Sequence, residues 1–137
     1  MDNRQFNALY SAPDRQALDI FSKFVGKNID FIRAGLGNAQ AMLAQLHASG
    51  TKIVAGTDSP IFPYGLALII ELESYVAAGL TPAAALRTAT SDAAMEMGAE
   101  RAVGTVRKGT LADLVILDGD PLTDINDLLK VTGVLKN

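Results

Sequence analysis

The chain of 137 residues contains no cysteine, a single histidine and no long apolar run. The missing cysteine excludes disulfides and thiolate metal sites, although it does not fix the compartment. The first 16 residues hold no apolar core of signal-peptide length, and the longest strongly apolar run, residues 65–70, is far shorter than the roughly 20 residues of a membrane helix. These absences predict a soluble protein with no membrane partner, cytoplasmic by default.

A strongly basic surface is also missing. The net charge is −3 and the isoelectric point is near 5.0, so nothing in the composition offers a basic face to a phosphate backbone. Nucleic acid is therefore excluded as an expected partner. Apolar residues make up 49% of the chain and charged residues 20%, which is typical of a globular protein, and the length suits about one domain.

Capping residues and helical periodicity predict two helices in the first part of the chain. The stretch Ser11-Ala12-Pro13-Asp14 has the form of a helix start, because a hydroxyl can accept amide hydrogens and an acid follows three residues later. It predicts a helix near residues 13–25. Asn38 can cap a second helix that continues to residue 49, where Gly50 supplies a left-handed stop.

Residues 51–55 are short, partly β-branched and bounded by glycines, which predicts a buried strand. Three helices are predicted after it: a largely covered one at 66–78 that ends at Gly79, one from Pro82 to 89 capped by Thr81, and a short one that begins at Ser91 and ends at Gly98. The rest of the chain is predicted to form strands at 104–106, 114–117 and 131–135, turns at 107–109 and 118–121, and a short helix at 125–129. This order of helices and strands predicts an α/β fold.

Asp58 lies in the stretch AGTDSPIFPYG, residues 55–65, where an apolar run breaks into a loop with two prolines. In α/β folds, ligands bind and catalytic residues gather where strands give way to loops. Gly56 would let backbone approach closely, and Thr57 adds a hydroxyl. However, aspartates also cap turns, and here the turn would precede Pro60. The local sequence leaves both interpretations of Asp58 open.

His47 is the only histidine of the chain. A catalytic zinc site uses about three protein ligands, of which at least one and usually more are histidines. No His-x-His or His-Glu-x-x-His pair is present to complete such a set. His47 is therefore interpreted as a residue at the edge of a helix face.

The remaining candidate groups have structural interpretations. Glu71 and Glu73 lie two residues apart, so they point in different directions on a helix and are predicted to be rim residues. Asp118 and Asp120 lack the spacing of a calcium loop and are predicted to be turn residues. The sequence has neither the Gly-x-Ser-x-Gly elbow of serine hydrolases nor a Gly-x-x-x-x-Gly-Lys phosphate loop.

Three stretches together resemble the carboxy-terminal part of metal-dependent amidohydrolases, in the branch of the imidazolonepropionases and prolidase-like peptidases. The stretches are AGTDSP at 55–60, AGLTPAAALRTATSDAAMEMG at 78–98 and GTVRKGTLADLVILDGDPLTDI at 104–125. They follow the family's order and spacing, and the resemblance extends from Asn38 to the end of the sequence.

The resemblance implies the carboxy-terminal portion of a TIM barrel, with residues 51–55 as the last barrel strand. Residues 1–102 would be the terminal part of the barrel, and residues 103–137 would be the returning strands of a small β-sandwich. The implied activity is hydrolysis of a C–N bond in a small amide, cyclic amide or peptide. Asp58 would correspond to the acid that ligates a divalent metal, zinc by expectation, and that shuttles a proton to the leaving amine.

The sequence departs from the family pattern in its metal ligands. The family also uses a His-x-His pair on the first barrel strand, a bridging lysine or carboxylate and two further histidines, none of which is matched here. Many relatives carry histidine where this chain has Ile69. A full barrel takes roughly 250 residues, so we expect a fragment that by itself binds no metal and is inactive.

Two main hypotheses follow. In the first, the chain is the terminal piece of an amidohydrolase, with Asp58 as its acid and base. In the second, it is a non-catalytic remnant that self-associates as a homo-oligomer, because pairing residues 51–55 or 114–117 with a copy would cover unpaired edges. A third possibility is that a separate chain supplies the rest of the barrel.

Overall fold

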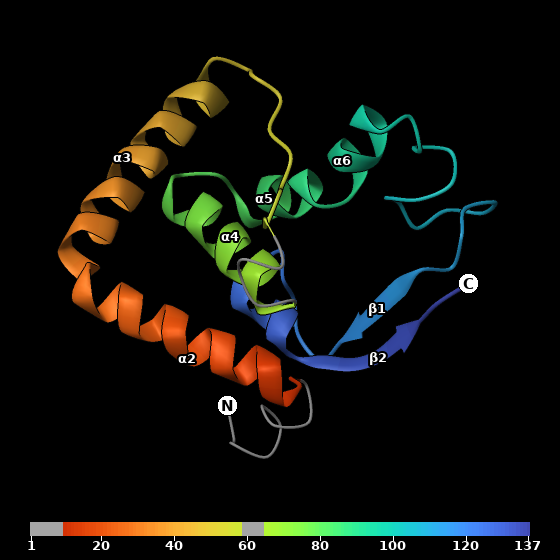
Figure 1. The fold of residues 1–137 in the computed structure, drawn as a ribbon. Helices are drawn as coiled ribbons and strands as arrows, with labels where there is room; N and C mark the ends of the chain where they lie inside the picture. The colour runs from red at the N-terminus through yellow and green to blue at the C-terminus, as the bar shows by residue number, and fades with distance from the viewer. Residues whose placement is uncertain (1–9, 59–64) are drawn as a thin grey trace. The chain divides into compact units, whose positions relative to one another are not determined.

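A computed structural model describes residues 10–58 and 65–137 of the chain. Its elements, labelled in Figure 1, are the helices α2 (Ala12–Lys27), α3 (Ile29–Ala48), α4 (Leu66–Ala77), α5 (Pro82–Thr88) and α6 (Ser91–Glu96), the strands β1 (Leu114–Leu117) and β2 (Val131–Leu135), and the 3-10 helix η1 (Ile125–Leu129). None of the described helices is long and apolar enough to cross a membrane. The chain divides into two compact units, Met1–Ala39 and Gln40–Asn137, with the boundary inside α3.

The helix α2 begins at the capping box that the sequence predicts. The Asp14 amide donates a hydrogen bond to Ser11 Oγ over 3.4 Å, and the Ser11 amide donates to Asp14 Oδ2 over 3.1 Å. Helix starts leave amide groups without partners in the helix, and these two bonds satisfy such groups. At the other end, Asn28 Nδ2 donates to the Phe24 carbonyl over 2.8 Å.

The helix α3 begins at Ile29, well before Asn38, so the predicted start is wrong. Gly35 and Gly37 disfavour a helix locally, by about 1 kcal/mol each relative to alanine. The helix nevertheless continues through both. Nucleation is the costly step of helix formation, so a helix that has already started extends more easily than a new one begins at Asn38.

Glycines in the left-handed region end α3 and α4, as the sequence predicts. Gly50 has φ 76 and Gly79 has φ 104, and glycine reaches such angles because it has no Cβ. After α4, the Gly79 amide donates to the Val76 carbonyl over 2.9 Å, and the Leu80 amide donates to the Tyr75 carbonyl over 3.1 Å. These two bonds form a Schellman motif, which satisfies carbonyls of the last turn.

The core of the second unit lies where α4 packs against α5 and η1 (Figure 1). Leu72 of α4, Ala85 of α5 and Ile125 of η1 are buried at its centre. Five partly buried residues pack around them: Ala55, Tyr75, Val76, Ala89 and Leu128. Burial of a leucine or isoleucine side chain contributes about 1.5–3 kcal/mol. Burial of these residues therefore stabilises the packing of α4, α5 and η1 against one another.

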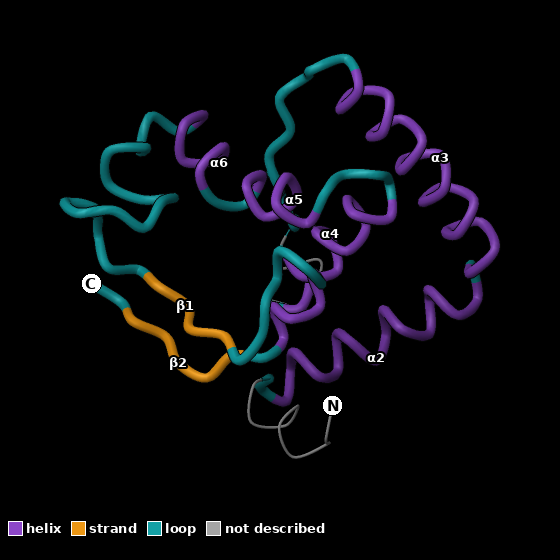
Figure 2. Tube along the Cα trace, turned by 180° about the vertical axis from the view of Figure 1, so that it is seen from behind, coloured by secondary structure: helices purple, strands orange, loops and turns teal. Residues whose placement is uncertain are grey.

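The strands β1 and β2 form a two-stranded antiparallel sheet, drawn in orange in Figure 2. Leu114 pairs with Leu135 and Val115 with Val134, and the register shifts between Ile116 and Leu117. The sequence predicts both strands correctly. The structure shows a mixed fold of helices and a small antiparallel sheet, and the assignment of these strands to a β-sandwich stays a prediction, because the described residues contain no second sheet facing this one.

The predicted strand at residues 51–55 is neither strand nor helix in the described structure, and residues 51–58, here called the extended segment, follow α3 as an open trace (Figure 1). The side chains of Thr51, Lys52 and Val54 are exposed, so the prediction of a buried strand is wrong. A strand depends on hydrogen bonds to a neighbouring strand. Here the Ala55 amide instead donates to the Thr88 carbonyl of α5 over 3.0 Å.

The strand predicted at 104–106 is a bend. Gly104 has φ 88, which lies outside the extended region, and its backbone approaches α6 closely. A Cβ built on Gly104 would lie 2.6 Å from the Cβ of Ala94 and 2.8 Å from the carbonyl oxygen of Thr90. The packing of this turn against α6 therefore requires glycine.

We expect Gly104→Ala to lower the free energy of unfolding by about 2–4 kcal/mol, because it adds both a left-handed φ for alanine and an overlap with α6. Gly109→Ala is the matched control, because Gly109 has φ 96 but no atom within 4 Å of an added Cβ. The control should cost about 1–2 kcal/mol. Urea unfolding measures both losses, and equal losses would contradict the close approach.

Candidate functional site

Asp58 lies at the end of the extended segment, and its side chain is exposed. Its φ of 52 is the one positive value at a non-glycine residue in the described part of the chain. A left-handed backbone costs a non-glycine residue roughly 1–2 kcal/mol, although aspartate tolerates it better than most residues. Residues held in such conformations cluster at functional sites. The turn-capping interpretation involves Pro60, which lies outside the described residues.

Glu71 of α4 reaches the backbone just before Asp58. Its Oε1 accepts a hydrogen bond from the Gly56 amide over 2.9 Å and a second one from the Tyr75 hydroxyl over 2.5 Å. Its other oxygen, Oε2, is buried and has no hydrogen-bond partner among the described residues. The interpretation of Glu71 as a rim residue is therefore wrong, because its carboxylate points toward the backbone of the extended segment.

The environment of Tyr75 keeps its hydroxyl protonated. Burial raises the pKa of Tyr75 well above its ordinary value, because the charged phenolate is poorly solvated there. The hydrogen bond to Glu71 and the negative charge of that carboxylate raise this pKa further. Tyr75 is therefore a lasting hydrogen-bond donor to Glu71 at physiological pH.

A hollow of about 300 Å³ lies beside the first half of the extended segment. Apolar side chains of this segment, α5 and α6 line much of it. The lining residues are His47, Gly50, Thr51, Lys52, Ile53, Val54, Leu80, Ala84, Arg87, Thr88, Asp92, Met95 and Glu96. Neither Asp58 nor Glu71 is among them. The hollow and the predicted catalytic residue therefore lie at different ends of one segment.

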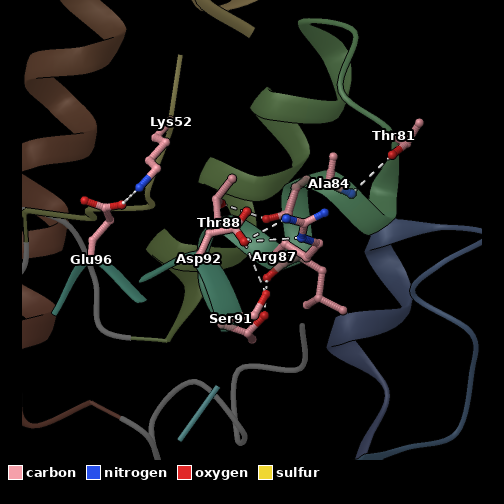
Figure 3. A network of polar contacts seen from close by, with 11 residues as sticks. Lys52, Thr81, Ala84, Arg87, Thr88, Ser91, Asp92 and Glu96 are labelled. Atoms are coloured by element: carbon pink, nitrogen blue, oxygen red, sulfur yellow. Dashed lines mark hydrogen bonds and ion pairs between the residues drawn. The ribbon is translucent and has the colours of Figure 1, made fainter. Parts of the chain in front are cut away.

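Two ion pairs lie at the hollow (Figure 3). Lys52 Nζ is 2.7 Å from Glu96 Oε1, and Arg87 Nη2 is 3.0 Å from Asp92 Oδ1. The hydrogen bond that Lys52 donates to the Glu96 carboxylate raises the pKa of Lys52. Solvent screens exposed pairs of this kind, so they contribute little to stability. Because the four charges cancel in pairs, they leave no net charge for a charged ligand, and His47 lies exposed in the last turn of α3.

The donor groups of the described residues do not form a metal site. Within residues 10–58 and 65–137, no group of three or more histidine, aspartate and glutamate side chains is placed to hold an ion. Catalytic zinc generally has three protein ligands. Asp58 alone offers one carboxylate, so a metal held there would need its other ligands from outside the described residues.

The profile of the amidohydrolase family matches residues 18–137. The chain belongs to the amidohydrolase family. This confirms the resemblance found in the three sequence stretches, and it places the chain in a family that is generally metal-dependent. No curated protein matches the chain.

Solved structures of amidohydrolases resemble part of this chain. A Xaa-Pro dipeptidase with methionine bound in its active site is 30% identical, with a TM-score of 0.66, and the match covers 71% of this chain and 24% of that one. A Bifidobacterium longum protein described as a prolidase is 35% identical, with a TM-score of 0.64, over 69% of this chain and 24% of that one. Molinate hydrolase is 26% identical, with a TM-score of 0.62 and coverage of 69% and 24%. The chain thus spans about a quarter of each structure.

The sequence predicted the role of one acidic residue correctly and that of another wrongly, and the role of a third stays untested. Asp120 is a turn residue as predicted, because its carboxylate accepts hydrogen bonds from the Leu122 amide over 3.0 Å and the Thr123 hydroxyl over 2.8 Å. The catalytic role of Asp58 stays a prediction. Glu71 was considered but wrongly interpreted as a rim residue, although an acid in an apolar helix with a tyrosine four residues later is a signal for such a pair.

Glu71→Gln should lower the pKa of Tyr75 toward its ordinary value near 10. The substitution removes the negative charge and weakens the acceptor, both of which raise this pKa, whereas burial of Tyr75 persists and keeps part of the shift. Assigned tyrosine resonances followed through an alkaline titration measure the change. Glu73→Gln is the matched control and should leave the pKa of Tyr75 unchanged, and an equal effect of the two variants would contradict the pair.

The same shift has a consequence for stability. The pKa of Tyr75 is higher in the folded chain than in the unfolded chain, so its contribution is complete below about pH 10 and is lost as the pH rises further. The free energy of unfolding should therefore fall less steeply with pH above about pH 10 in Glu71→Gln than in the unaltered chain.

Proposed function

We propose that residues 1–137 form the carboxy-terminal part of a metal-dependent amidohydrolase that cleaves a C–N bond in a small amide, cyclic amide or peptide. The family match over residues 18–137 carries this proposal. The similarity to a Xaa-Pro dipeptidase and to a protein described as a prolidase supports amide and peptide substrates. Because the chain spans 24% of each of these structures, the activity is proposed for a complete catalytic unit.

Asp58 is the proposed catalytic group. Its carboxylate is exposed at the end of the extended segment, where a substrate could reach it. A carboxylate can take a proton from the attacking nucleophile and return it to the leaving amine, and this kind of catalysis contributes about 10²–10⁴ in rate. Its left-handed backbone supports a functional role, since such strain gathers at active sites.

The proposal includes a divalent metal, which we expect to be zinc, with Asp58 as one ligand. The remaining ligands would come from outside the described residues, because these hold no metal-binding group. A single carboxylate does not hold a catalytic ion. We therefore propose that the 137-residue chain by itself is inactive.

The fold proposal follows from the same family. Residues 51–55 would be the last strand of a TIM barrel, which is supported by the family match over residues 18–137. Residues 1–102 would belong to the barrel. Residues 103–137, which contain β1 and β2, would belong to a small β-sandwich.

Asp58→Asn should lower kcat/KM for a proline-containing dipeptide or a small amide by about 10²–10⁴ in the natural polypeptide that carries these residues. Asp118→Asn is the matched control, because Asp118 is also an exposed aspartate after an apolar run, and it should keep full activity. Residues 1–137 assayed alone with added zinc should bind no stoichiometric metal and hydrolyse nothing. Full activity of Asp58→Asn, or metal-dependent hydrolysis by the chain alone, would contradict the proposal.

The second candidate function is non-catalytic self-association as a homo-oligomer. It is favoured by the exposed apolar side chains along residues 51–55 and the small sheet, which include Val54, Val115 and Ile116. Apolar surfaces and open strand edges of this kind pair readily with a copy of the same chain. A second copy that added its residues 51–55 or 114–117 to these edges would cover both.

Light scattering of the purified chain at micromolar concentration should then give an oligomer. Val54→Lys should shift the chain toward monomer by at least tenfold in dissociation constant, because a buried charge opposes pairing of the extended segment. Val106→Lys is the control, since Val106 is 84% exposed and lies outside both edges, compared with 43% for Val54. A stable monomer of the unaltered chain would overturn self-association.

A further inference from the structure

We propose that Glu71 is a positioning residue that holds the turn carrying Asp58 in its reactive conformation. This role rests on the proposed function of Asp58. Glu71 acts through the backbone, because its Oε1 accepts the amide hydrogen of Gly56, two residues before Asp58, over 2.9 Å. The bond joins α4 to the end of the extended segment across 15 positions of sequence.

Tyr75 fixes the Glu71 carboxylate from the side of α4. Its hydroxyl donates to the same Oε1 over 2.5 Å, and its ring packs against the core formed by Leu72, Ala85 and Ile125. Residues four apart on a helix lie next to each other, so formation of α4 alone brings Tyr75 close to Glu71. The carboxylate is thereby oriented by the most buried part of the second unit.

Stability does not explain a carboxylate at this position. Oε2 of Glu71 is buried without a hydrogen-bond partner among the described residues, and an unsatisfied buried oxygen destabilises a fold. The helix α4 is otherwise largely apolar, so a leucine at this position would fit its composition. A buried polar atom without a partner calls for an explanation, and a functional role is one that the contact with the Gly56 amide supports.

The backbone of Asp58 supplies the second half of the inference. A φ of 52 is unfavourable for aspartate and persists only when neighbouring contacts impose it. The Gly56 bond to Glu71 and the Ala55 bond to Thr88 attach consecutive amides to two different helices. Because both amides are bonded, the backbone of residues 55 and 56 has little freedom to rotate and so to relieve the left-handed conformation of Asp58.

Amide hydrogen exchange of the full chain tests the contact. Glu71→Leu should lower the protection of the Gly56 amide at least tenfold and shift the Asp58 coupling constant away from left-handed backbone. Glu71→Gln keeps an acceptor oxygen and should stay within about threefold of the unaltered chain. Glu73→Leu is the control, and the amide of Ala85, which donates to the Thr81 carbonyl over 2.9 Å, reports whether the core stays folded.

Hydrolysis by the natural polypeptide tests the role. Glu71→Leu should lower kcat at least tenfold with little change in KM, and Glu71→Gln should restore most of it, because the acceptor rather than the charge orients the turn. If Glu71→Leu does not fold, Tyr75→Phe decides, and unchanged Gly56 protection and kcat in that variant would overturn the proposal.

The two proposals fail in different ways. Loss of activity in Asp58→Asn with unchanged kcat in Glu71→Leu would overturn the role of Glu71 and leave that of Asp58. Full activity in Asp58→Asn would overturn the catalytic role of Asp58, and the role of Glu71 in positioning a reactive group would fall with it, even if Gly56 lost protection in Glu71→Leu.

Discussion

Two adjacent hydrogen bonds determine where the extended segment ends. The Ala55 amide donates to the Thr88 carbonyl of α5, and the Gly56 amide donates to the Glu71 carboxylate of α4. Both helices share one buried core, so the segment is attached to helices rather than to neighbouring strands. The backbone geometry of Asp58 depends on this attachment, because a strained φ persists only where its surroundings hold it.

The charged side chains of the second unit differ in their exposure and in their hydrogen-bond partners. The pairs Lys52–Glu96 and Arg87–Asp92 are largely exposed, so solvent weakens them and they contribute little to stability. Glu71 is the opposite case, because one of its oxygens is buried and the other binds two donors. A partly buried carboxylate with specific partners and one unsatisfied oxygen calls for an explanation more than exposed surface pairs do.

Membership of the amidohydrolase family relates these features to one another. The exposed apolar side chains of Val54 and of β1 are the surfaces on which both proposals depend, because either the rest of a catalytic unit or a second copy is proposed to cover them. The hollow beside residues 51–54 lies away from Asp58. It therefore fits a packing surface better than the place where a C–N bond is cleaved.

The sequence alone determined several of the local elements and the family. Helix starts such as Ser11, glycine stops such as Gly50 and the strands β1 and β2 depend on neighbouring residues, so their patterns were sufficient. Only the tertiary structure decided that residues 51–55 lack a ladder, that Gly104 bends against α6 and that Glu71 turns inward. Each of these depends on atoms that are distant in sequence, and neither periodicity nor propensity specifies which distant groups will meet.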